Sequence, residues 1–334
     1  MKAIVFMEQS SEYRELPLTN LPQEWARIKV EVSGLCGTDV AKLGKHAFPP
    51  NHTQILGHEF IGKIVDMNGP SNAVAVGDYA VCMPILPCGD CEACFSGMDN
   101  LCVKAEAIGR TVPGAFAEYV NVPIKNLIKV VDNACHDVYV LADPLAVCLH
   151  AIRLARTQSS GKKALIVGDG SIGCLLAWLL HKQCKDVSIK GIHSDNLRFV
   201  ESLGIHLQNA DVFSRSYDEI YETVGRKQPQ TLSECIKAIK PGGVVVVLGV
   251  YSPDYVYPLV ARELFIKESR LIGANAYTQD EFRETVNLIR DNEKELVGFI
   301  SHTFPLTKFS DALTAMRRKC GLTLKIVFKP GGLL

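Results

Sequence analysis

The sequence predicts an α/β protein that combines a β-rich region with a parallel sheet whose strands are connected by helices. Three observations predict this class. Over residues 1–145, short apolar stretches are separated by Gly, Pro and Asn, which indicates strands joined by turns. Over residues 146–275, strand-like runs alternate with helical runs, as in βαβ units. Residues 276–334 return to a mixture of helices and a closing strand.

The expected elements can be justified in chain order. The strands of the first region are short apolar runs with turn residues at their ends: Lys2–Phe6, Ala26–Val32, Gly62–Val65, Tyr79–Cys82 and Phe116–Val120. The second region should contain strands Ala164–Val167, Val187–Ile192, Glu219–Glu222 and Gly243–Leu248, with helices Ile172–Gln183, Asn196–Leu203 and Leu232–Ile239 between them. Residues 244–248 show no polar alternation, as expected for a strand covered on both faces. The last region should hold helices Asp280–Arg290 and Phe309–Lys319 and the strand Thr323–Phe328.

Length and charge exclude several classes of protein. A chain of 334 residues suggests about two domains. Lys and Arg number 36, as do Asp and Glu, so the formal net charge is zero and a dedicated nucleic-acid binder is disfavoured. No apolar run approaches the roughly 18 residues of a membrane span, and the first apolar run is too short for a secretory signal. We therefore expect no membrane association and a cytoplasmic location.

The strongest local signal is a cluster of cysteines. Cys88, Cys91 and Cys94 are spaced by two residues each, and Cys102 follows after seven more. Four thiolates satisfy a tetrahedral zinc ion and leave no open position, so this lobe (about 86–103) should hold a structural zinc. The chain has twelve cysteines and no export signal, and clustered thiols in a reducing compartment are more often metal ligands than disulfides. Free thiols in a surface loop are the alternative.

A second set of residues offers the ligands of a catalytic metal. Cys36, His58 and Asp143 supply a thiolate, an imidazole and a carboxylate. Three protein ligands with an open position are the pattern of a catalytic zinc. Such a zinc lowers the pKa of an alcohol and stabilises the alkoxide.

A glycine-rich turn predicts a dinucleotide site. The motif G-x-G-x-x-G follows an expected strand and opens an expected helix, and the residues proposed to line it are Gly168, Gly170, Ser171, Ile172 and Gly173. In that context the glycines allow a tight turn, and the helix N-terminus receives a pyrophosphate. The backbone near Val224 and Leu248 should flank the same cofactor.

The end of the strand expected at Val187–Ile192 favours NADP over NAD as the cofactor. In NAD enzymes an acidic residue about twenty positions after the glycines binds the ribose 2′-hydroxyl, but here that position is Gly191. A glycine removes a carboxylate that would repel a 2′-phosphate, and His193, Ser194 and Arg198 could contact that phosphate. The alternative is that Asp195 reaches the ribose of NAD.

The motifs Cys36-Gly-Thr38-Asp39, Gly57-His58-Glu59-x-x-Gly62 and the four cysteines, in this order, resemble the zinc-dependent medium-chain dehydrogenases. The resemblance runs over essentially the whole chain and is greatest to the sugar-alcohol branch, which includes sorbitol, threonine and galactitol-phosphate dehydrogenases. It implies a GroES-like β-barrel catalytic domain at 1–145 and 276–334. It also implies a doubly wound Rossmann domain at 146–275.

The resemblance assigns roles to individual residues. Cys36, His58 and Asp143 match the catalytic zinc ligands, Glu59 matches a carboxylate beside the metal, and Thr38 matches the hydroxyl that binds the substrate oxygen. Aspartate at 143 departs from the glutamate usual in the polyol branch, so a water bridge or ligation by Glu59 stays open.

The position of the family's proton-relay histidine is also altered. Ala41 stands where many relatives carry that histidine, and alanine cannot move a proton. His46 or His52, in the following loop, could substitute for it.

Together these features predict a zinc-dependent oxidoreductase. It would transfer a hydride between a secondary alcohol (polyol, amino-polyol or sugar phosphate) and NAD(P), with two zinc ions per chain, NADP favoured over NAD, and a homodimer or homotetramer as the assembly. The alternatives are a non-catalytic NAD(P)-binding structural or redox-sensing protein, which would lack the metal ligands, and a zinc-free quinone or enoyl reductase, which would lack the four-cysteine lobe.

Overall fold

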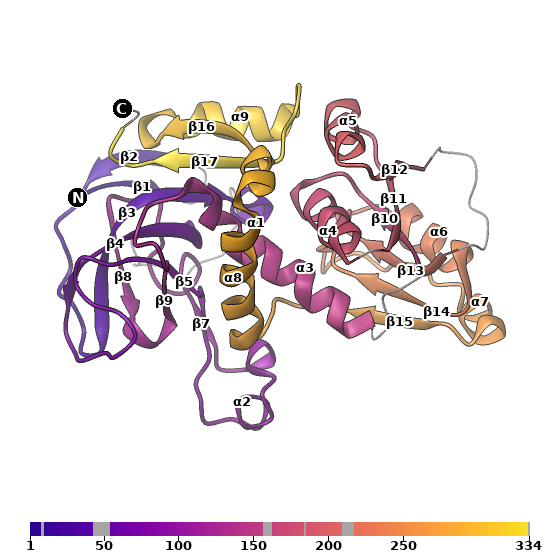
Figure 1. The fold of residues 1–334 in the computed structure, drawn as a ribbon, viewed down its shortest axis with the longest axis horizontal. Coiled ribbons are helices and arrows are strands. Elements are labelled where there is room, and N and C mark those ends of the chain that lie inside the picture. Colours follow the sequence, from indigo (N-terminus) through magenta and orange to yellow (C-terminus); the bar gives the residue numbers. More distant parts are fainter. Residues whose placement is uncertain (8–9, 43–53, 156–161, 184, 209–216, 333–334) are drawn as a thin grey trace. The chain divides into compact units, whose positions relative to one another are not determined.

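The computed structural model contains two compact units (Figure 1). It describes residues 1–334 except 8–9, 43–53, 156–161, 184, 209–216 and 333–334. Unit 1 comprises Met1–Asp143, Thr278–Arg318 and Lys325–Leu334, and unit 2 comprises Pro144–Tyr277 and Lys319–Leu324. The chain thus returns to unit 2 at Lys319–Leu324, a stretch that the expected boundaries placed with the first domain.

The centre of unit 1 is a seven-stranded sheet built around a long strand, β3 (Trp25–Leu35). Along β3 runs the antiparallel strand β4 (Glu59–Met67), while β8 (Tyr119–Pro123) and β17 (Lys325–Lys329) pair with its beginning and its end. The sheet is completed by β5 (Tyr79–Cys82), β9 (Leu127–Lys129) and β16 (Ile300–Pro305). Since β4 and β17 flank β3, residues far apart in sequence meet at its C-terminal end.

The remaining elements of unit 1 surround this sheet. Two small antiparallel pairs are formed by β1 (Lys2–Phe6) with β2 (Ser11–Glu15) and by β6 (Ile85–Leu86) with β7 (Glu106–Ala107). The helices are α1 (Gly37–Lys42), α2 (Glu92–Phe95), α8 (Gln279–Leu296) and α9 (Phe309–Arg318), with 3-10 turns at Asp99–Leu101, Ile124–Asn126, Asp137–Leu141, Val297–Phe299 and Leu306–Lys308. The aromatic rings of Phe116, Phe309 and Phe328 pack with centroids 5.2–5.5 Å apart and join the two ends of the chain in one core.

Unit 2 is a six-stranded sheet in which every pair is parallel. Its order is β12 (His206–Leu207), β11 (Asp186–Lys190), β10 (Lys163–Val167), β13 (Tyr217–Glu222), β14 (Ile239–Val247) and β15 (Arg270–Gly273), which is the Rossmann order 3-2-1-4-5-6. Its helices are α3 (Ala142–Ala155, which starts in unit 1), α4 (Ser171–Lys182), α5 (Ser194–Ser202), α6 (Gln230–Ala238) and α7 (Ala261–Lys267) (Figure 1). The order reverses beside β10, and ligands of such sheets bind at that point, outside the carboxyl ends of the strands.

Most expected elements are present, and the differences have physical causes. Strands β1 and β5 have the expected bounds, and the apolar run at 244–246 is fully buried in β14. The strand expected at Phe116–Val120 is shifted, since β8 starts at Tyr119 while Phe116 is buried in the aromatic core. Strand β2 was not expected because its residues are polar and mostly exposed.

One helical segment has the length and composition of a membrane span. It covers Asp137–Ala155, and 72% of its most apolar window is buried inside the protein. It also carries Asp143, whose carboxylate belongs to the site described below. A mostly buried apolar helix of this kind also occurs as the core helix of a soluble protein.

His136 should make the stability of unit 1 depend on pH. Its ring lies 2.5 Å from Glu293 of α8 and 2.7 Å from Asp132. Burial lowers the pKa of His136, but the hydrogen bond to Glu293 and the two carboxylates raise it overall. A raised pKa gives stability that is complete below the unfolded value and is lost as pH rises through the folded value.

We therefore expect His136→Gln to cost about 0.5–1 kcal/mol at pH 5.5 and nearly nothing at pH 9, because the pair is partly exposed. Urea unfolding at both pH values measures this cost. His206→Gln, at an exposed position in β12, is the control and should show no such difference. An equal cost of His136→Gln at both pH values would exclude the charge effect.

Candidate functional site

Three metal-binding side chains meet in unit 1. The ligand atoms of Cys36, His58 and Glu59 all lie within 4.8 Å of one another, and His58 and Glu59 are buried. Cys36 follows β3 directly and Glu59 begins β4, so the antiparallel pairing of these strands brings them together. A thiolate, an imidazole and a carboxylate gathered in this way are the donor set of a zinc ion.

Asp39 organises this cluster. Its carboxylate accepts a hydrogen bond from the backbone N–H of Cys36 at 3.1 Å and lies 3.4 Å from Nδ1 of His58. Burial lowers the pKa of the His58 imidazole, but the Asp39 carboxylate raises it well above the usual value. Because Nδ1 faces Asp39, Nε2 is the ring nitrogen left for a metal, as in carboxylate–histidine–zinc arrangements.

Glu59 is held by a buried lysine. The Nζ of Lys325 donates to both carboxylate oxygens of Glu59, at 2.8 and 2.6 Å, and neither side chain is more than 3% exposed. Burial alone would lower the pKa of Lys325, but the charges of Glu59 and Cys36 raise it. The carboxylate of Glu59 is therefore already compensated by a cation of the protein.

Asp143 and Thr38 lie beside the same cluster. Asp143 is partly buried and close enough to influence the pKa of both Glu59 and Lys325, although among the described residues it is not part of the 4.8 Å group. The hydroxyl of Thr38 donates to Sγ of Cys36 at 3.2 Å. All five residues that the motifs predicted for this site are thus close together.

Of the three positions considered for the proton relay, the structure describes Ala41. Ala41 lies in α1, directly after the cluster residues. His46 and His52, the substitutes considered above, lie outside the described residues.

The four cysteines form a second cluster. Their sulfur atoms lie within 4.8 Å of one another, with Cys102 Sγ 3.4 Å from Cys88 Sγ and Cys91 Sγ 3.5 Å from Cys94 Sγ. A tetrahedral zinc with bonds of about 2.3 Å separates its sulfurs by about 3.8 Å, so the cluster fits this ion. A backbone hydrogen bond from Cys94 lowers the pKa of Cys91 to about 7, which favours the thiolate.

The glycine turn of unit 2 has the geometry of a diphosphate site. Gly168 has φ +116°, and a Cβ at Gly173 would lie 1.9 Å from the carbonyl oxygen of Gly168, so the strand and the helix approach closely. A Cβ at Gly170 would meet nothing within 4 Å, which leaves room above the turn. Helix α4 has no side-chain cap, so the N–H groups of its first turn, at Ser171, Ile172 and Gly173, are available to an anion.

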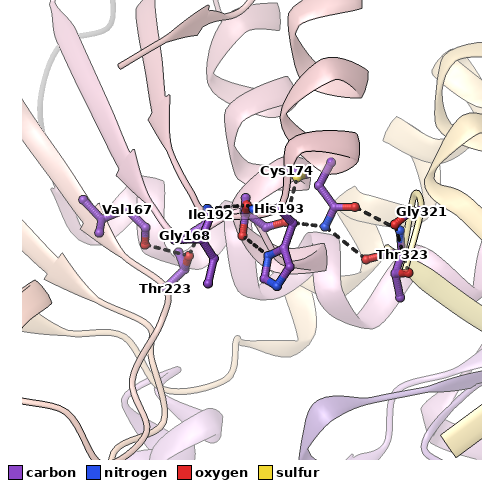
Figure 2. A network of polar contacts seen from close by, with 10 residues as sticks. Val167, Gly168, Cys174, Ile192, His193, Thr223, Gly321 and Thr323 are labelled. Atoms are coloured by element: carbon purple, nitrogen blue, oxygen red, sulfur yellow. Dashed lines mark hydrogen bonds and ion pairs between the residues drawn. The ribbon is translucent and has the colours of Figure 1, made fainter. Parts of the chain in front are cut away.

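The other predicted cofactor residues follow the strands next to this turn. Gly191 follows β11, His193 caps α5, and Ser194 and Arg198 lie within that helix. Val224 and Leu248 follow β13 and β14. Backbone hydrogen bonds join the carboxyl ends of these parallel strands: Gly168 N donates to the carbonyl of Lys190, and Thr223 N donates to the carbonyl of Val167. Figure 2 shows the contacts of Thr223 with this turn. Arg198 is paired with Asp195.

Sequence reasoning missed three kinds of residue. Asp39 belongs to one of the quoted motifs, but no role was predicted for it. Lys325 was also missed, although a lysine within a mostly apolar strand is a signal for a buried cation. The third is Lys319, whose pKa is lowered by burial and by the charge of Arg226 and raised by that of Asp169 in the glycine turn. No local pattern marks Lys319, because its position follows from the return of the chain to unit 2.

Family models match almost the whole chain. The alcohol dehydrogenase GroES-like domain matches residues 22–132, and the glucose dehydrogenase C-terminus matches residues 136–325. D-altritol 5-dehydrogenase of Agrobacterium fabrum is 30% identical over 320 residues, which cover 92% of this chain and 94% of that protein.

Solved structures agree with these matches. Galactitol-1-phosphate dehydrogenase from Escherichia coli has a TM-score of 0.88 and 26% identity, covering 99% of this chain and 100% of that one. A protein of Sinorhizobium meliloti 1021 assigned as a zinc-binding dehydrogenase and bound to NADP has a TM-score of 0.90 and 26% identity, covering 98% of this chain and 99% of that one.

The fold and the metal and dinucleotide sites define a zinc-type, NAD(P)-dependent alcohol dehydrogenase with a GroES-like domain and a Rossmann domain. The chain belongs to the zinc-type medium-chain dehydrogenases, in their sugar-alcohol branch, as the motifs predicted. It is an enzyme that transfers a hydride between an alcohol and a nicotinamide dinucleotide, with zinc and NAD(P) as its cofactors.

Proposed function

We propose that this enzyme oxidises a secondary alcohol of a polyol, amino-polyol or sugar phosphate, with NADP as the preferred acceptor. The observation that carries the proposal is the cluster of Cys36, His58 and Glu59, of which the last two are buried, in a chain that also has the glycine turn. The substrate class is supported by relatives named D-altritol 5-dehydrogenase and galactitol 1-phosphate 5-dehydrogenase.

The residues of unit 1 would act as follows. Cys36 and His58 hold the catalytic zinc, and Asp39 keeps the His58 ring in orientation. Zinc supplies a Lewis acid that lowers the pKa of the substrate hydroxyl, and the nicotinamide accepts the hydride. The hydroxyl of Thr38 orients the substrate oxygen, for which it must turn away from Cys36 Sγ.

We propose Asp143 as the third protein ligand. Glu59 is the nearer carboxylate, but both of its oxygens are engaged by Lys325. Moving Glu59 onto the metal would leave the ammonium group of Lys325 buried without its partner, which is costly. The Glu59–Lys325 pair then serves to keep the metal pocket in shape.

In unit 2 we propose that the amides of Ser171, Ile172 and Gly173 bind the pyrophosphate, with Lys319 adding positive charge. His193, Ser194 and Arg198 would contact a 2′-phosphate, and Gly191 leaves space for it. This supports NADP over NAD, and the NADP-bound relative is consistent with it. Val224 and Leu248 would line the rest of the cofactor site.

We also propose a second zinc in the four-cysteine lobe, giving two per chain, and a homodimer or homotetramer in the cytoplasm. Reduced thiols in the lobe require a reducing compartment. A dimer is supported by the edge position of β15 and by exposed apolar side chains in the chain before it, Val256 and Phe265, which are 89% and 81% exposed.

Steady-state turnover of the zinc-loaded protein on polyols, amino-alcohols and sugar phosphates, each with NAD and NADP, tests this proposal. We expect turnover on at least one secondary alcohol, a higher kcat/KM with NADP, and loss of activity with a zinc chelator. Turnover with NAD alone would refute the NADP preference. Zinc-replete protein that is silent across the panel would favour a non-catalytic role, since Ala41 removes the usual proton relay.

A further inference from the structure

An acidic residue inside the glycine motif reaches across to the next strand. Asp169 is 4% exposed, and its Oδ2 accepts hydrogen bonds from the backbone N–H groups of Ile192 at 2.8 Å and His193 at 2.5 Å. Its Oδ1 lies 2.8 Å from Nδ1 of the His193 ring. Figure 2 shows these contacts converging on Ile192 and His193.

The main chain of Asp169 is fixed as well. Its carbonyl oxygen accepts from the Cys174 thiol at 3.4 Å and from the buried amide of Asn196 at 2.8 Å. Asn196 in turn bonds the backbone of Thr323, in the segment that returns to unit 2 (Figure 2). The direction of the Asp169 side chain is therefore set by several independent contacts.

This carboxylate occupies the space of a side chain at position 191. A Cβ added to Gly191 would lie 2.3 Å from Oδ2 of Asp169 and 2.4 Å from its Cβ and Cγ, well inside contact distance. Position 191 is where a Rossmann enzyme that prefers NAD carries its ribose-binding carboxylate. Asp169 and an acidic residue at 191 are thus mutually exclusive in this structure.

The same carboxylate holds His193 by one ring nitrogen. With Nδ1 against Asp169, the other ring nitrogen, Nε2, is the one left to face a ligand, and the side chain is 25% exposed. A carboxylate at Nδ1 fixes the orientation of the ring, so that Nε2 is the nitrogen directed at an anion. The carboxylate of Asp169 is itself buried, and its charge is stabilised by the backbone N–H groups of Ile192 and His193 and by the His193 ring.

We propose that Asp169 is the residue that sets the cofactor preference: it excludes a side chain at position 191 and positions His193 to bind the 2′-phosphate of NADP. The inference rests on the proposed function and deepens it. The glycine at 191 is then a consequence of Asp169, and His193 is the residue through which Asp169 acts.

The test measures dissociation constants of NADPH and NADH by nicotinamide fluorescence, so it does not depend on turnover. We expect Asp169→Ala to weaken NADPH at least about tenfold, the value of one charge-assisted hydrogen bond, and NADH no more than about threefold. Asp169→Asn keeps the volume of the side chain and should show the same trend if the alanine variant is unstable. Asp186→Asn, on the exposed start of β11, is the matched control and should leave both constants unchanged.

Three double variants separate positioning from a general structural role. His193→Gln should weaken NADPH as Asp169→Ala does, and combining the two should add little, because both remove one interaction. Gly191→Ala should lower the melting temperature in the natural background but not in Asp169→Gly, where the space is free. Asp169→Gly with Gly191→Asp should reverse the preference toward NADH.

The outcomes are distinguishable. A natural protein that binds neither nucleotide overturns the proposed function and this inference together. A natural protein that binds NADH more tightly than NADPH, or one whose ratio of dissociation constants is unchanged in Asp169→Ala and Asp169→Asn, overturns the inference alone.

Discussion

Replacing Cys36 by serine is expected to abolish turnover, with kcat/KM falling about a thousandfold or more. Serine offers no thiolate, so the cluster keeps only His58 and one carboxylate as anchors for zinc. The metal contributes several kcal/mol to transition-state stabilisation, and each 1.36 kcal/mol is a factor of ten in rate. Zinc content should fall from two ions per chain to one.

The matched control is Cys91→Ser in the four-cysteine lobe. It removes a thiolate of the same kind and should also cost one zinc per chain, but it leaves the Cys36 cluster intact. We expect a lower melting temperature and turnover that persists below it, because the metal of such a lobe contributes folding energy. If Cys36→Ser kept activity within tenfold while Cys91→Ser abolished it, the roles of the two clusters would be reversed.

Replacing Lys185 by methionine is expected to destabilise unit 2 by about 3–5 kcal/mol, the cost of leaving a buried charge without its partner. The side chains of Lys185 and Glu219 are 1% and 0% exposed and form an ion pair. Tyr221 donates to the other oxygen of Glu219 at 2.9 Å. Urea unfolding followed through Trp178, which is buried in α4 of the same unit, measures the loss.

Two further variants identify the cause. Lys163→Met removes a lysine that is 54% exposed and 3.7 Å from Asp186, so it should cost no more than about 0.5 kcal/mol. Adding Glu219→Gln to Lys185→Met removes the uncompensated charge while keeping an acceptor for Tyr221, and should recover much of the stability. Equal costs for Lys185→Met and Lys163→Met would show that burial of the pair is unimportant.

Local sequence determined the parts of the sites that depend on short spacing. The four cysteines lie within fifteen residues, and a two-residue gap brings neighbouring thiolates to one metal whatever the rest of the chain does. The glycine turn was likewise predictable, because a strand, three glycines and a helix open a βαβ unit. The alternation of strands and helices was enough to predict the parallel sheet, since each element buries a recognisable apolar face.

The boundaries of the elements were less predictable. Phe116 was assigned to a strand from its apolar neighbours, but the aromatic core that buries it comes from both ends of the chain. The return of Lys319–Leu324 to unit 2 has no local signal, because a short segment of mixed polarity is compatible with either unit.

Only the tertiary structure decided which charges meet. Lys325 and Glu59 are 266 positions apart, and Asp169 and His193 are 24 apart, yet each pair is in direct contact. The sequence does not show whether a lysine is buried or solvated. The energy of its charge depends on the groups around it in space, and these need not be its neighbours along the chain. For the same reason the sequence could show a glycine at position 191, but only the packed structure shows the carboxylate of Asp169 that takes its space.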